Sequence, residues 1–208
     1  MNKKHFLLLL AILSMSFVFS QKQEKIKLKG VIMKNDYHKK ISWVKSKPVS
    51  LESKDFTVST LSTTYLQIYF GMMEKNGKPY LTNIRLVNHF DNSDWIFYDE
   101  VSYLLGSRKE IRTHKGVVFK VKTDKTVRDV DNGVTEHSDI LALGQAKEFI
   151  KHVIENDETR LNVRFTNNDD NKYQDFTISS TKKLKKHFKV LINNYNILNK
   201  AYKIDETF

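Results

Sequence analysis

The residues best suited to chemistry stand close together between residues 128 and 139. Glu136, His137 and Asp139 combine two carboxylates with an imidazole. These are the usual groups for general acid–base catalysis and for metal binding. A small hydrolase that uses these three residues is therefore one hypothesis for the function.

The same stretch is also typical of a surface hairpin, which is the interpretation we favour. Asn132-Gly133 predicts a tight turn between two strands, and that turn places Arg128 opposite Glu136. An exposed ion pair between these two residues contributes less than about 1 kcal/mol to stability. Successive residues of a strand point to opposite faces, so Glu136 and His137 are expected on different faces.

Other patterns for enzymes, metals and cofactors are missing or incomplete. The chain has no G-x-S-x-G and no H-E-x-x-H pattern. Gly71 and Gly77 are too far apart for a phosphate loop, and Pro79 occupies the position where Ser or Thr binds magnesium. Asn76-Gly77 instead predicts a hairpin turn. We expect no metal and no cofactor, and binding is favoured over catalysis.

Lysines interleaved with aromatic residues predict a binding surface in the first quarter of the chain. Lys39, Lys40 and Lys45 surround Trp43. Stacking and charge attraction together hold a polyanion or a sugar chain in such a groove. The alternative is a solvated surface without a ligand, because most of the basic residues are lysines. Arginine is better suited to bind phosphate or carboxylate, since its guanidinium can donate two parallel hydrogen bonds.

Two arginines are further candidates for ligand binding. Arg128 belongs to the hairpin described above, and Arg164 lies on the polar side of a strand, beside the Asp169-Asp170 turn. For Arg164 an ion pair within the structure is the favoured alternative. The turn at residues 169–171 has oxygen atoms suited to calcium, but an exposed hairpin turn needs the same residues.

Composition narrows the class of protein. The 208 residues include 35 basic and 24 acidic residues, no cysteine, seven glycines and two prolines. The lack of cysteine excludes disulfide scaffolds, cysteine-based zinc sites and thiol nucleophiles. Few glycines and prolines exclude collagen-like and disordered proteins. The formal charge of +11 favours an acidic polymer, an envelope protein or the membrane surface as partner.

The N-terminus predicts export. Lys3 and Lys4 precede an uncharged, mostly apolar run from Phe6 to Phe19, and cleavage is expected after Ser20. The run is shorter than the about 20 residues of a membrane-spanning helix, so a retained anchor is only the alternative. Residues 21–208 are then a single domain in the periplasm or outside the cell. No nucleic acid partner is expected, and no membrane span in the mature chain.

Hydrophobic periodicity predicts an α+β fold, an antiparallel β-sheet with two amphipathic helices in the C-terminal half. Alternation indicates strands near residues 26–33, 56–58, 65–72, 80–90, 95–105 and 117–121. A helix is expected over 142–156, followed by strands at 161–165 and 173–178 and a last helix with an apolar stripe. We therefore predict an exported, non-catalytic binding or accessory module for an anionic or carbohydrate ligand or a protein partner.

Overall fold

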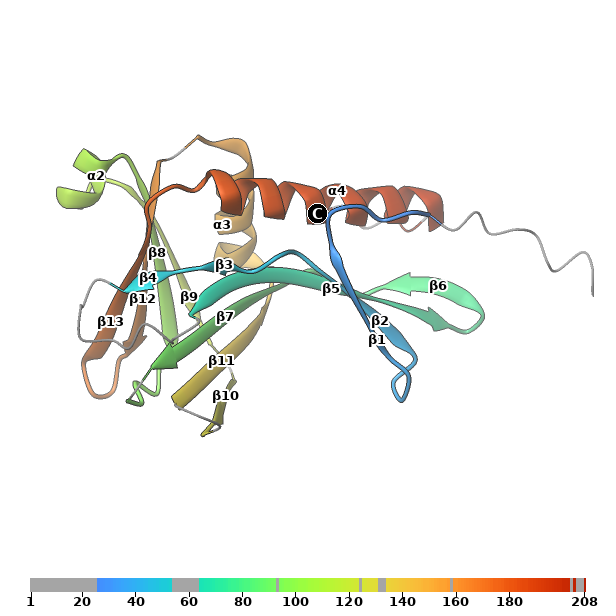
Figure 1. Ribbon diagram of the computed structural model, residues 1–208, viewed down its shortest axis with the longest axis horizontal. Coiled ribbons are helices and arrows are strands. Elements are labelled where there is room, and N and C mark those ends of the chain that lie inside the picture. The colour runs from blue at the N-terminus through green and yellow to red at the C-terminus, as the bar shows by residue number, and fades with distance from the viewer. Residues whose placement is uncertain are drawn as a thin grey trace, which may run out of the picture.

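Apolar and polar residues that alternate along the chain produce strands in both halves of the molecule. The structure is a computed structural model that describes residues 26–53, 64–92, 94–123, 125–130, 134–157, 159–202, 204 and 208. The expected signal peptide at 1–20 and the strand expected at 56–58 lie outside these residues. The described chain forms two antiparallel sheets and three helices (Figure 1). The predicted α+β fold is confirmed, with two sheets where the sequence predicts one.

The larger sheet, sheet A, has the strand order β1-β2-β5-β7-β11-β10, and β3 and β6 also pair with β5. Its strands are β1 (Ile32–Asp36), β2 (Ile41–Lys45), β3 (Val49–Ser50), β5 (Tyr65–Lys75), β6 (Lys78–Leu81), β7 (Arg85–Asn92), β10 (Thr126–Asp129) and β11 (Val134–Leu141). The predicted Asn76-Gly77 turn connects β5 to β6, and both residues have positive φ, as tight hairpin turns require.

The strand expected over 80–90 is divided into β6 and β7 at residues 82–84. Both halves pair with β5, but at the division the amide of Gly71 donates to the hydroxyl of Thr82, 2.7 Å away. A side-chain oxygen has replaced a backbone carbonyl in the ladder, so the regular pairing is interrupted there.

The smaller sheet, sheet B, has the order β4-β13-β12-β8-β9. Its strands are β4 (Glu52–Ser53), β8 (Glu100–Gly106), β9 (Val117–Lys122), β12 (Arg160–Asn167) and β13 (Lys172–Ile178). A short helix that the periodicity does not reveal, α2 (Arg108–Arg112), follows β8. Its capping box is nevertheless visible in the sequence, because Ser107 and Glu110 exchange side-chain hydrogen bonds with each other's backbone amides.

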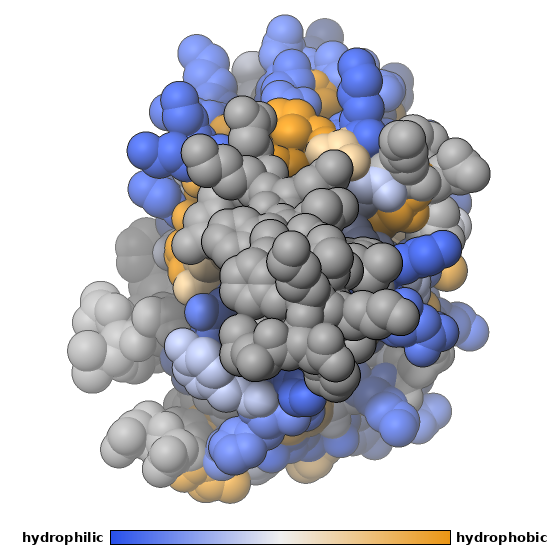
Figure 2. All heavy atoms as spheres, turned by 90° about the vertical axis from the view of Figure 1, so that its right-hand side faces the viewer, coloured by the Kyte–Doolittle hydropathy of each residue, from blue (hydrophilic) through white to orange (hydrophobic). Residues whose placement is uncertain are grey.

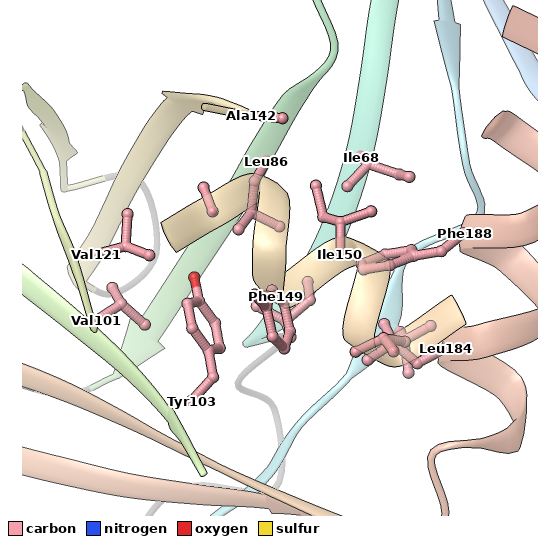
Figure 3. Packing of buried hydrophobic residues seen from close by; sticks show 14 of the residues in the cluster. Ile68, Leu86, Val101, Tyr103, Val121, Ala142, Phe149, Ile150, Leu184 and Phe188 are labelled. Carbon is pink, nitrogen blue, oxygen red and sulfur yellow. The ribbon is translucent and has the colours of Figure 1, made fainter. Parts of the chain in front are cut away.

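The core lies between the two sheets and is completed by α3 (Gly144–Glu155) and α4 (Lys182–Tyr202). The sheets contact each other directly through Phe90 of β7 and Phe165 of β12, whose ring centroids are 5.3 Å apart. Further along, α3 separates them, because Phe149 stacks on Tyr103 of β8 at 4.0 Å and lies edge-on to Phe188 of α4 (Figure 3). The inner faces of both sheets are therefore occupied by the core.

The predicted stripe of the last helix faces this core. Its buried members are Leu184, Phe188, Leu191, Tyr195 and Leu198. The segment before β1 runs along the same helix, because Asn194 donates a side-chain hydrogen bond to the carbonyl of Lys29 at 3.1 Å. None of the described helices has the length and apolar character to cross a bilayer.

Candidate functional site

The register between β10 and β11 places Arg128 opposite Glu136, as the hairpin turn predicts. Glu136 is 0% exposed, however, so this is not the exposed ion pair expected from the sequence. One carboxylate oxygen accepts the amides of Ile96 and Phe97 at 2.7 and 2.8 Å. The other accepts the amide of Tyr98 at 3.2 Å and Nε of Arg128 at 3.4 Å. Glu136 thus binds the loop that precedes β8.

This loop also explains where β8 begins. The sequence predicts a strand from Trp95, but the pairing starts only at Glu100, because three successive amides point at the Glu136 carboxylate. Phe97 has a φ of 58°, which is unfavourable for a bulky residue. Its half-exposed ring stacks on Trp95 and lies 5.0 Å from the guanidinium of Arg128.

His137 and Asp139 lie on the outer face of sheet A, on the other side of β11 from Glu136. One oxygen of Asp139 accepts Nε of Arg85 at 2.6 Å, and the other accepts the hydroxyl of Tyr69. The three residues of the hydrolase hypothesis therefore do not converge. Within the described ranges, no three His, Asp or Glu side chains are grouped so that they could hold a metal ion. The expectation of no metal or cofactor stays a prediction.

Rings from four adjacent strands lie across the outer face of sheet A. Trp43 of β2 meets Tyr69 of β5 edge-on at 5.3 Å. Tyr65 of β5 stacks on His89 of β7 at 4.5 Å, and His89 meets His137 of β11 at 5.8 Å. We call these five residues the ring row. Sequence reasoning identified Trp43 and His137 but missed the others, because only the strand register brings them to one face.

Positive charge accompanies the ring row. Lys45 Nζ lies 5.5 Å from the centroid of the Tyr69 ring, and Lys34 pairs in register with Trp43. Burial lowers the pKa of Lys45, and the charge of Lys34 lowers it further. The nearby carboxylate of Asp139 is already engaged by Arg85. Neither Lys34 nor Lys45 forms an ion pair within the described part of the chain.

The two histidines of the row are uncharged at neutral pH. Burial lowers the pKa of His89, and the proximity of His137 adds to the effect. Burial also lowers the pKa of His137, against the opposing influence of Asp139. Burial raises the pKa of the Tyr69 hydroxyl, and its hydrogen bond to Asp139 raises it further. The row is thus a neutral, hydrogen-bonding aromatic surface with lysines at one end.

The remaining candidate lysines lie apart from this surface. Lys39 and Lys40 are exposed in the turn between β1 and β2. The Lys39 amide donates to Asp36 at 3.1 Å, and Lys40 lines a separate hollow with Tyr80 and Tyr202. On the side of the molecule where this turn and the C-terminal end of α4 lie, hydrophilic side chains predominate along the rim (Figure 2). The lysine cluster expected around Trp43 is therefore divided between two places.

Arg164 lies on the outer face of sheet B. Its Nε and Nη2 donate to the two oxygens of Asp175 at 2.7 and 2.8 Å, and its guanidinium lies 4.1 Å from the centroid of Tyr173. The hydrogen bond to Asp175 raises the pKa of Arg164. The arginine is thus held by the neighbouring strand β13 rather than by the Asp169-Asp170 turn.

The geometry defines an α+β protein. The outer face of sheet A has aromatic rings and lysines, and the outer face of sheet B is polar. No family model matches the sequence, and no characterised protein or solved structure matches the chain.

Proposed function

We propose that this chain is an exported binding module that holds an acidic polysaccharide on the outer face of sheet A. The observation that carries the proposal is the ring row with Lys34 and Lys45 at its β1–β2 end. Aromatic faces pack against the apolar face of a sugar ring, and lysines attract the acidic substituents. The signal-like residues 1–20 support an envelope or extracellular location, where such polymers occur.

The dimensions of the row suit a polymer. Adjacent strands of a sheet lie about 4.8 Å apart, so the four strands β2, β5, β7 and β11 span roughly 14 Å. The ring row also runs diagonally, because Trp43 pairs with Gly71, six residues or about 20 Å along β5 from Tyr65, which pairs with His89. This length accommodates several monosaccharide units in succession. Both long helices lie on the inner side of sheet A (Figure 1), which leaves its outer face free of described helices.

Dextran sulfate is a suitable probe, measured by the fluorescence of Trp43 in a Trp95→Phe background. Neutralising the local charge with Lys34→Gln and Lys45→Gln is expected to weaken binding about tenfold. The matched control is Lys182→Gln with Lys186→Gln, which removes the same charge from the exposed side of α4. If the control pair weakens binding equally, the whole-molecule charge binds the polymer and the proposed site is wrong.

Trp43→Ala separates stacking from ion exchange, because it removes a ring and no charge. Its binding is measured by retention on immobilised dextran sulfate, since the fluorescent reporter is lost. We expect the affinity for dextran sulfate, measured from retention, to fall about tenfold, because an aromatic stacking surface is lost. Unchanged retention, in a variant that unfolds at the wild-type temperature, contradicts the proposal that the ring row contacts the polymer.

A further inference from the structure

A second surface, independent of the ring row, lies on the outer face of sheet B and contains a hollow of about 430 Å³. Pockets for small molecules typically measure about 300–1,000 Å³. The hollow is lined by alternate residues of β8, β9, β12 and β13, with His114 and Asn168 at its ends: Glu100, Ser102, Leu104, Val118, Lys120, Asn162, Arg164, Thr166, Tyr173 and Asp175.

The strand register explains the shape of the hollow. In one row across the sheet, Ser102 stands between Lys120 and Arg164. A small side chain on a central strand between two long ones leaves a depression. Thr166 and Asn162 continue this floor of short side chains along β12, on either side of Arg164.

The charges that line the hollow balance one another. Arg164 pairs with Asp175, and Lys120 Nζ lies 4.0 Å from Glu100. An ionic ligand of either sign has to compete with one of these pairs, whereas a neutral ligand does not. In this respect the hollow differs from the ring row, whose lysines form no ion pair with a residue that the structure describes. The lining therefore favours a neutral ligand.

Hydrogen-bonding groups are available on the floor. The side chains of Asn162 and Thr166 have no hydrogen-bond partner within the part of the chain that the structure describes. The hydroxyl of Ser102 donates to Glu100 at 3.3 Å and keeps its oxygen as an acceptor. An amide and two hydroxyls close together can bind the several hydroxyl groups of one ligand.

Tyr173 provides an aromatic wall beside these groups. The residue is 59% exposed although the guanidinium of Arg164 covers one face of the ring. Asp175 fixes that guanidinium through two hydrogen bonds, so one face of the ring packs on a fixed group. An aromatic ring next to an amide and hydroxyls is complementary to a sugar, which has an apolar face and a rim of hydroxyls. We infer that the hollow binds a neutral sugar ring.

The test is titration of the folded protein with cellohexaose, maltohexaose and chitohexaose, followed by amide NMR shifts. We expect at least one of these neutral oligosaccharides to shift the amides around Ser102 and Asn162. Tyr173→Ala and Asn162→Ala are each expected to weaken binding about tenfold, equivalent to about 1.4 kcal/mol. The matched control is Tyr80→Ala, which removes another exposed tyrosine that also lies under a cation, Lys75.

Three results overturn the inference. One is the absence of shifts on the outer face of sheet B with all three oligosaccharides. Another is wild-type affinity in both Tyr173→Ala and Asn162→Ala, shown by their melting curves to be folded. The last is binding of a hyaluronan hexamer, but of no neutral sugar, in the hollow. Because Lys34→Gln with Lys45→Gln leaves this surface intact, failure here is distinguishable from failure of the proposed polymer site.

Discussion

The buried carboxylate of Glu136 accepts the amide of Phe97 at 2.8 Å and holds that residue at a φ of 58°. The two residues are 39 positions apart in the chain. Their contact joins β11 of sheet A to the loop that leads into sheet B. A carboxylate that accepts three backbone amides and an arginine is a structural group. It explains why the side chain of this acid lies on the opposite face of β11 from that of His137.

Replacing Glu136 with Gln is expected to lower the free energy of unfolding by about 3 kcal/mol. Gln keeps one acceptor oxygen, so the donors to the other oxygen, the buried amide of Tyr98 and the partly buried Arg128, lose their partner. Urea denaturation measures the change. Glu148→Gln, on the exposed side of α3, is the matched control and is expected to change stability by less than about 0.5 kcal/mol. Equal stability of the two variants contradicts the structural role of Glu136.

Two substitutions of Phe97 isolate the backbone strain. Phe97→Gly and Phe97→Ala remove the same ring, but only glycine adopts positive φ at no steric cost. We expect the glycine variant to be more stable than the alanine variant by about 1 kcal/mol. Thermal unfolding compares the two, and an alanine variant of equal or greater stability means that Phe97 is not in the left-handed region.

The histidines of the ring row make stability depend on pH. Burial lowers the pKa of both His89 and His137 below the unfolded value of about 6.5. The unfolded chain therefore binds more protons at mildly acidic pH. This contribution is fully present above about pH 6.5 and is lost as the pH falls through the lowered folded values.

We accordingly expect the free energy of unfolding to decline between about pH 7.5 and pH 5, and the decline to be shallower in His89→Gln with His137→Gln. Urea titrations at several pH values measure it. His38→Gln, exposed in the β1–β2 turn, controls for the loss of an imidazole. A double variant with the wild-type pH profile contradicts the prediction.

Gly71 allows the ring row to form. A Cβ at this position would lie 2.5 Å from Cδ1 of Ile41 and 3.0 Å from Cζ3 of Trp43. Gly71→Ala is therefore expected to destabilise the protein by about 1–3 kcal/mol through overpacking. Ile41→Val removes the closest atom, so the double variant should be more stable than the sum of the single changes implies. Strict additivity in urea denaturation contradicts this arrangement.

The fold was largely predictable because its signals are local. The apolar stripe of α4 and the Asn76-Gly77 turn follow from helical and strand periodicity and from turn chemistry. The division of the strand over 80–90 was not, because it depends on the hydroxyl of Thr82 bonding to Gly71 in another strand. Strand propensity along the chain does not show that a side-chain hydroxyl takes the place of a backbone carbonyl in the hydrogen-bond ladder.

The candidate sites were predictable only in part, for the same reason. Strand alternation correctly predicted that Glu136 and His137 lie on opposite faces. The interleaving of lysines with aromatic residues identified Trp43 and Lys45. The partners Tyr69 and His89 required the register of four strands, and the Arg164–Asp175 pair required that of β12 with β13. The burial of Glu136 depends on the path of a loop forty residues earlier.

The hydrogen bond from the Asn194 side chain to the Lys29 carbonyl connects residues that are 165 positions apart. Because α4 follows every strand of both sheets, a growing chain cannot close its core until this helix has been synthesised. Such distant closure slows folding and makes it a late, cooperative event. Folding that waits for α4 is compatible with the export proposed above, because a secretion channel accepts an unfolded polypeptide.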